Sequence, residues 1–107
     1  MEYKRLKSRV FCTHAFTPEA VKSDLANTYG INVTSDVPFE KGCTVKLRIE
    51  MNKPSKKIRC KAVVDHVTKD ESSEAYEIGL GRLSLSNEDF KLLLNNCIEE
   101  DEQKKFD

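Results

Sequence analysis

The fold is decided by residues 76–98, YEIGLGRLSLSNEDFKLLLNNCI, where a short strand leads into the one helix that the sequence predicts. Ser86 stands at the N-cap, where its hydroxyl oxygen can accept a hydrogen bond from a free N–H of the first turn. Asp89 fits the second half of a capping box, and Leu85 and Phe90 have the spacing of a hydrophobic staple. These signals predict where the strand ends and the helix begins.

The predicted helix spans 86–99 and carries a single apolar stripe. Its members recur at the spacing of one helical face: Phe90, Leu93, Leu94, Cys97 and Ile98. Such a stripe must be buried against another element. Because the chain before it offers only short strands, we expect the helix to pack on a sheet with Phe90, Leu94 and Cys97 largely buried.

The chain before the helix alternates apolar and polar residues in short segments separated by turns. The clearest segment, 43–51, has these apolar members on one face: Cys43, Val45, Leu47, Ile49 and Met51. A turn at 52–55 leads into a second alternating segment, 58–64. Further strands are predicted over 10–16, 31–34 and, more weakly, 20–25. Strands without intervening helices predict a mainly β fold, a six-stranded antiparallel β-barrel with one C-terminal α-helix.

The 107 residues are predicted to form one domain. Its expected parts are a basic arm over 1–8, the barrel over 9–83, the helix, and an acidic tail over 100–107. The first nine residues hold four Lys and Arg against one acid, Glu2, whereas acids predominate from Glu99 onward. One end of the chain is therefore basic and the other acidic.

The whole-chain charge argues against a nucleic-acid partner. The sequence has 18 Lys and Arg against 18 Asp and Glu, so its formal net charge is zero and gives no overall attraction to DNA or RNA. No basic face with interleaved aromatic residues is evident from the sequence. We therefore expect no DNA or RNA partner.

Other broad classes of protein are also disfavoured. No apolar run approaches the ~20 residues of a membrane span, and the N-terminus lacks the apolar stretch of a signal peptide, which predicts a cytoplasmic protein. The four cysteines, Cys12, Cys43, Cys60 and Cys97, lie far apart without metal-ligand spacing, so we expect buried, reduced thiols and no metal. We see no nucleophile motif, carboxylate pair or phosphate-binding glycine loop, and expect no enzyme.

The order of these elements resembles the PilZ domain family over most of the chain. The matching residues are Gly30-Ile31-Asn32-Val33, Pro38, Gly42, Val45-Lys46-Leu47-Arg48-Ile49, 58–66, Tyr76-Glu77-Ile78-Gly79-Leu80, Leu83, Leu85-Ser86 and Glu88-Asp89. The resemblance implies a six-stranded antiparallel barrel with a C-terminal helix. It also implies a ligand, because many members of the family bind the bacterial second messenger cyclic di-GMP.

The first ligand motif of the family is R-x-x-x-R, and Arg5-Leu6-Lys7-Ser8-Arg9 matches it. Two guanidinium groups can make bidentate contacts to phosphate oxygens or to the O6 and N7 edge of guanine, and they can stack on a base. Two arginines at this spacing are also common on ordinary charged surfaces. The motif predicts Arg5 and Arg9 as ligand-binding residues, with a solvated basic patch as the other interpretation.

The second motif, [D/N]-x-S-x-x-G, is degenerate. Its positions are occupied by Leu25, Asn27 and Gly30, so only the glycine is kept. Leu25 cannot accept a hydrogen bond, whereas the amide of Asn27 can still bond to a base. The resemblance therefore adds Asn27 and Gly30 to the predicted site and predicts weakened recognition of the base.

Two functions follow from these observations. The first is a cytoplasmic signalling module that binds cyclic di-GMP through the R-x-x-x-R arm and passes the change to an unidentified protein partner. The alternative is a PilZ-like adaptor that has lost the nucleotide and acts by protein contact, with motility or surface-appendage control as the setting that the resemblance suggests. A titration with cyclic di-GMP separates the two.

Overall fold

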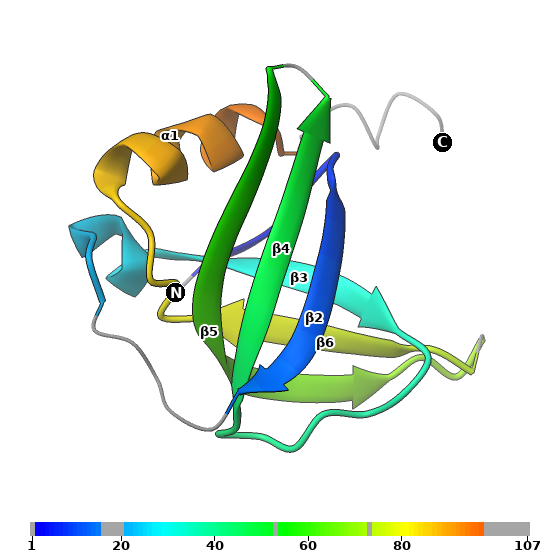
Figure 1. Ribbon diagram of the computed structural model, residues 1–107. Helices are drawn as coiled ribbons and strands as arrows, with labels where there is room; N and C mark the ends of the chain where they lie inside the picture. Colours follow the sequence, from blue (N-terminus) through cyan, green and yellow to red (C-terminus); the bar gives the residue numbers. More distant parts are fainter. Residues whose placement is uncertain (1, 16–20, 53, 73, 98–107) are drawn as a thin grey trace.

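The structure is a computed structural model that describes residues 2–15, 21–52, 54–72 and 74–97. Its elements in chain order are β1 (Glu2–Arg5), β2 (Arg9–Ala15), the 3₁₀ helix η1 (Asp24–Asn27), β3 (Tyr29–Ser35), β4 (Thr44–Asn52), β5 (Ser55–Lys69), β6 (Tyr76–Gly81) and α1 (Asn87–Asn95) (Figure 1). The strands form one six-stranded mixed sheet in the order β1-β3-β6-β5-β4-β2. The prediction of a mainly β fold with a helix near the C-terminal end is confirmed.

The sheet folds over along β5, which is 15 residues long. Its first part pairs with β4 and its second part with β6, and the register shifts between Val64 and His66. A bulge of this kind bends a strand and increases its twist. Figure 1 shows the result: β2, β4 and the first part of β5 form one layer that crosses β3, β6 and the rest of β5.

The expectation of a closed, purely antiparallel barrel is wrong. β1 runs parallel to β3, and β1 and β2 occupy the two ends of the strand order, so the sheet is open between them. The cause lies in the connection between these strands. Leu6 is buried in the core and forms a bridge with Cys97, and this carries the chain from one edge of the sheet to the other without a hairpin.

The basic arm expected over 1–8 is therefore an ordered part of the sheet, because residues 2–5 pair with β3. The weak strand expected over 20–25 is also wrong in its described part. The hydroxyl of Ser23 accepts a hydrogen bond from the Leu25 N–H at 3.1 Å and caps η1, which replaces the strand. The predicted turn at 52–55 is confirmed as the β4–β5 hairpin.

The core fills the space between the two layers and beneath α1. The predicted core residues that are buried include Val45, Leu47, Ile49, Ile58, Cys60, Ala62, Val64, Ile78, Leu80, Phe90 and Cys97. Two expectations fail: Cys43 and Leu94 are only half-buried. Leu93 is buried in place of Leu94, because the helix turns its Phe90, Leu93 and Cys97 side to the sheet.

The predicted start of the helix is confirmed. Ser86 is the N-cap, and its hydroxyl oxygen accepts a hydrogen bond from the Asp89 N–H at 3.2 Å. Leu85 and Phe90 are both buried beside the cap. The described helix ends at Asn95 and is shorter than the predicted 86–99, while Ile98 and the acidic tail lie outside the described residues.

The state of the cysteines and the search for a membrane-spanning helix also bear on the expectations from the sequence. All four cysteines are free thiols, with Cys60 and Cys97 buried and Cys12 and Cys43 half-buried. Among the residues that the structure describes, no helix has the length and apolar character needed to cross a membrane.

The docking of α1 can be tested with a matched pair of variants. We expect Leu93→Ala to lower the free energy of unfolding by about 2 to 5 kcal/mol, because it leaves a cavity in the core. Leu94→Ala, on the half-buried side of the same helix, should cost less than about 1.5 kcal/mol. Urea denaturation of both variants measures the difference. Equal losses for the two variants would contradict the orientation of α1.

Candidate ligand-binding site

Arg5, the first arginine of the R-x-x-x-R motif, is the last residue of β1. Its guanidinium donates a hydrogen bond to the Thr34 hydroxyl at 3.0 Å and another to the Glu77 carboxylate. Thr34 in turn donates to Glu77 at 3.3 Å. The Arg5 and Glu77 side chains are 36% and 39% exposed, so this ion pair contributes only about 0 to 1 kcal/mol to stability. Arg5 is held in place, but weakly enough to be released by a competing anion.

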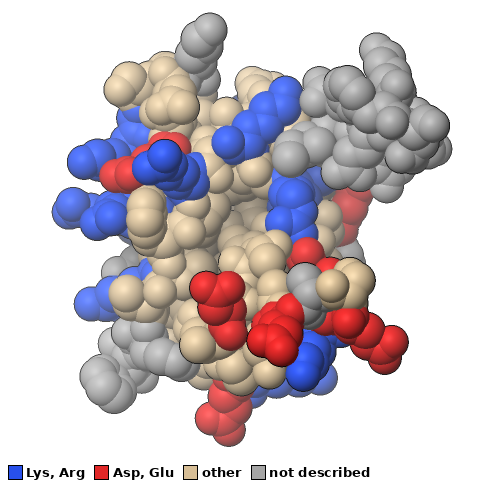
Figure 2. All heavy atoms as spheres, turned by 90° about the vertical axis from the view of Figure 1, so that its right-hand side faces the viewer, with Lys and Arg blue, Asp and Glu red and all other residues tan. Residues whose placement is uncertain are grey.

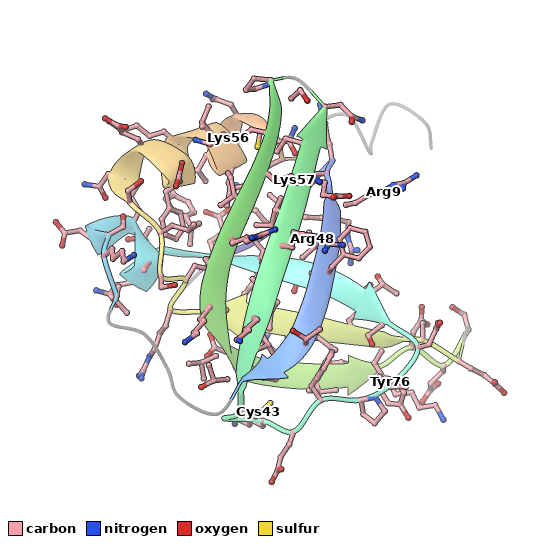
Figure 3. The ribbon with its side chains drawn as sticks, in the orientation of Figure 1. Arg9, Cys43, Arg48, Lys56, Lys57 and Tyr76 are labelled. Carbon is pink, nitrogen blue, oxygen red and sulfur yellow. The ribbon has the colours of Figure 1, made fainter. Side chains whose placement is uncertain are left out.

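Arg9, the second arginine, is the first residue of β2 and lies opposite Glu50 of β4. Its side chain is exposed and extends beyond the edge of the sheet (Figure 3). Within the described part of the chain, its guanidinium has no ion-pair partner. The structure therefore places Arg5 and Arg9 on the two edge strands, joined by the three-residue crossing 6–8.

A hollow of about 890 Å³ opens between the layers near this crossing. It is lined by β2, β4 and β5 on one side and by the end of β3 and the loop after it on the other. Thr34, which accepts the hydrogen bond from Arg5, lines it, and so does Val10, the neighbour of Arg9. Figure 2 shows a hollow in this side of the molecule, with Lys and Arg along its left and upper margins and Asp and Glu below. Neither arginine of the motif lines the hollow itself: Arg5 contacts Thr34, which does, and Arg9 precedes Val10, which does.

The lining of the hollow is mixed: half of its residues are apolar, and the polar half includes the cations Lys46, Arg48, Arg59 and Lys61. Its apolar side chains include Val10, Cys12, Val33, Val37, Phe39 and Leu47. Burial raises the pKa of the Cys12 thiol to about 11, so this cysteine stays protonated and uncharged at neutral pH. Cavities of about 300 to 1,000 Å³ with apolar walls and a few polar groups are typical of small-molecule sites.

The residues of the second motif lie away from the hollow. Asn27 is the exposed last residue of η1, and Leu25 packs partly buried against the core. Neither residue lines the cavity. The Glu2 N–H donates to the Thr28 carbonyl at 2.8 Å, so η1 lies at the start of β1 and Arg5 at its end. The structure does not bring Asn27 together with the two arginines.

Gly30 is buried in β3, and packing explains why a glycine stands there. It lies opposite Tyr3 of β1 in the register. A Cβ atom at this position would lie 2.4 Å from the Leu80 carbonyl oxygen and 2.7 Å from the Tyr3 ring. The glycine therefore allows β1 to lie close against β3.

A cluster that the sequence analysis missed joins β1 to the bend of β5. The Tyr3 hydroxyl donates to the Asp65 carboxylate at 2.5 Å, and the Tyr3 ring lies edge-on to His66 with 4.8 Å between ring centroids. Gly79 makes room for His66, because a Cβ at Gly79 would lie 2.0 Å from the imidazole. No pattern in the sequence identifies this cluster, because its members come together only through the bulge in β5 and the parallel pairing of β1 with β3.

Burial, together with the hydrogen bond to Asp65, raises the pKa of Tyr3 to about 12. The neutral phenol is therefore favoured by folding. Its contribution to stability is complete below pH 10, the ordinary pKa of tyrosine, and is lost as the pH rises through 12.

This cluster gives a prediction about pH and stability. We expect Tyr3→Phe to lower the free energy of unfolding at neutral pH by about 1 kcal/mol, because the hydrogen bond to Asp65 is lost. The gap between the parent and the variant should shrink as the pH is raised above 10. Urea denaturation across this pH range measures it, with Tyr76→Phe as a matched control that keeps the Tyr3 cluster. A gap that stays constant up to pH 12 would contradict the proposed role of the phenol.

A scan against protein-family models, a search of curated proteins and a search of solved structures each find no match to this chain.

Proposed function

We propose that the chain is a PilZ-like receptor module, without enzymatic activity, that binds cyclic di-GMP at the hollow between the two layers. One observation carries the proposal. Thr34, which holds Arg5, and Val10, which follows Arg9, both line a cavity of about 890 Å³. Arg5 thus contacts one residue of the lining and Arg9 is next in sequence to another, and the cavity has the volume of a small-molecule site.

Arg5 takes part by exchanging partners. In the unliganded arrangement its guanidinium contacts Glu77 and Thr34. Releasing the exposed ion pair with Glu77 costs about 1 kcal/mol or less, whereas charge-assisted hydrogen bonds to a phosphate are worth about 1.5 to 3 kcal/mol. The exchange therefore favours the ligand, and it frees Glu77 on β6. This local change is what the module would pass to a protein partner in the cytoplasm.

Arg9 takes part without giving up an ion pair to any residue that the structure describes. Its exposed side chain at the start of β2 can turn toward the hollow and contact the second phosphate or the edge of a guanine. Asn27 would contribute only to a base that extends along β1, because the register places it beyond Glu2, more than about 10 Å from the Arg5 position. The arginines therefore supply most of the binding energy.

The alternative is a PilZ-like adaptor that acts by protein contact without the nucleotide. Two observations favour it: Leu25 packs against the core and offers no polar group to a base, and Arg5 already has protein partners. Both functions use the same fold, so binding measurements must decide between them.

Isothermal titration with cyclic di-GMP tests the receptor proposal. We expect the parent protein to bind, and Arg5→Ala or Arg9→Ala to weaken binding about tenfold to a hundredfold, because each removes a charge-assisted contact. Glu77→Gln should strengthen binding, since it releases Arg5. Lys91→Ala removes an exposed positive charge on α1 and should leave the affinity unchanged.

Two results would reject the receptor proposal. One is the absence of binding heat for both the parent and Glu77→Gln when urea denaturation shows that both are folded. The other is an equal loss of affinity in Lys91→Ala and Arg9→Ala. In either case the adaptor function remains.

A further inference from the structure

The outer face of β2, β4 and β5 concentrates positive charge in a chain whose net charge is zero. Alternate residues of these strands, such as Leu47 and Ile58, are buried, so the residues between them point outward. The cations at these outward positions are Arg9, Lys46, Arg48, Lys57, Arg59 and Lys61. We call this surface the basic face, and Figure 3 shows Arg48 and Lys57 on it, with Arg9 at its edge.

Among the described outward positions of β2, β4 and the first part of β5, Glu50 is the one acidic residue beside these cations, and Asp65 lies in the second part of β5. The Glu50 carboxylate is 3.7 Å from the Arg48 guanidinium and 3.6 Å from the Lys57 ammonium. One carboxylate shared between two largely exposed cations neutralises only part of their charge. The basic face therefore keeps an excess of positive charge, which complements a polyanion.

An exposed aromatic side chain lies within the basic face. Phe11 of β2 is 40% exposed and pairs in register with Arg48 of β4. The Arg48 guanidinium carbon lies 4.4 Å from the centroid of the Phe11 ring, a cation–π contact. Arg59 of β5 follows Arg48 in the same row across the sheet. The Phe11 ring and the Arg48 guanidinium form a planar platform with further cations around it.

We infer that the basic face binds single-stranded nucleic acid. An unpaired base stacks on Phe11 and Arg48, while the phosphates on either side of it contact the lysines and arginines of the neighbouring rows. Successive outward residues of a strand are about 7 Å apart, so three rows give a short site for a few nucleotides. This function goes beyond cyclic di-GMP binding but shares part of its surface. Arg9 belongs to both sites, and Phe11, Lys46, Arg48, Arg59 and Lys61 also line the hollow. Arg5 and its partner Glu77 are not on this face, so Arg5 separates the two functions.

The aromatic platform is what selects this ligand over other polyanions. The bases of a duplex are stacked on each other and cannot reach Phe11, and an acidic peptide matches the charge but has no planar base to stack. An oligonucleotide with free bases uses both features of the surface.

Fluorescence anisotropy with labelled oligo(dT) and oligo(U) of about ten nucleotides tests the inference. The decisive variants are Phe11→Leu, which keeps an apolar side chain but removes the ring, and Phe11→Tyr, which keeps the ring. We expect Phe11→Leu to weaken binding by about tenfold or more, and Phe11→Tyr to retain it. Urea denaturation confirms that both variants are folded.

The salt dependence of oligonucleotide affinity distinguishes the cations that contact phosphates from the Phe11 ring that stacks on a base. Arg59→Ala and Lys46→Ala should each lower the slope of log affinity against log salt by about one, because each removes a phosphate contact. Phe11→Leu should leave that slope unchanged. Lys91→Ala on α1 serves as the charge control, and Arg5→Ala should keep oligonucleotide binding even where it weakens cyclic di-GMP binding. The Arg5→Ala result distinguishes failure of this inference from failure of the proposed receptor function.

Three outcomes would overturn the inference. The first is no binding of either oligonucleotide at low salt. The second is equally tight binding of duplex DNA or polyglutamate, which would assign the face to charge alone. The third is an equal affinity in Phe11→Leu and Phe11→Tyr, which would show that the ring makes no contact with a base.

Discussion

The bend in β5 is the constraint on which the rest of this structure depends. A single strand pairs with β4 over its first part and with β6 over its second, so its bulge sets how the two layers cross. The Asp65 and His66 side chains at the bulge hold Tyr3 of β1, and Gly79 and Gly30 give these rings the space they need. The bend therefore fixes the position of β1 as well, although β1 and β5 are not neighbours in the sheet.

Placing β1 beside β3 leaves the sheet open between β1 and β2, and the hollow lies between β2 and the end of β3, beyond the last residue of β1. A hairpin between β1 and β2 would have put Arg5 and Arg9 on paired strands. The crossing through Leu6 instead puts them on opposite edges, with the hollow between the layers nearby. The same geometry gives Arg5 its contacts with Thr34 and Glu77. An arginine held by a weak, exposed ion pair next to a cavity is oriented without being committed to that partner.

The sequence was most informative where structure depends on neighbouring residues. The Ser86 cap, the turn at 52–55 and the alternating strands 43–51 and 58–64 all follow from local spacing, and all are present. The prediction of a closed barrel was wrong because β1 pairs in parallel with β3 and leaves the sheet open. No local sequence pattern encodes this pairing. The prediction that Leu94 is largely buried was wrong because Leu92, Leu93 and Leu94 are all apolar. Only the docking of the helix on the sheet decides which of them is buried. The Arg5–Glu77 pair joins residues far apart in the chain and could not be predicted from spacing.

Strand register also decides how charge is distributed over the surface. The net charge of the whole chain therefore gave a poor guide to its binding partners. A net charge of zero argued against nucleic acid, but that sum includes acids such as Glu77 and Asp65 that belong to other parts of the sheet. Phe11 is an isolated aromatic in the sequence and gains a cationic neighbour only when β2 pairs with β4. Because binding depends on the local field and on the groups that share one face, a surface can complement a polyanion even when the whole chain is neutral. Charge per face, set by the register, is therefore the quantity that bears on the partners of this protein.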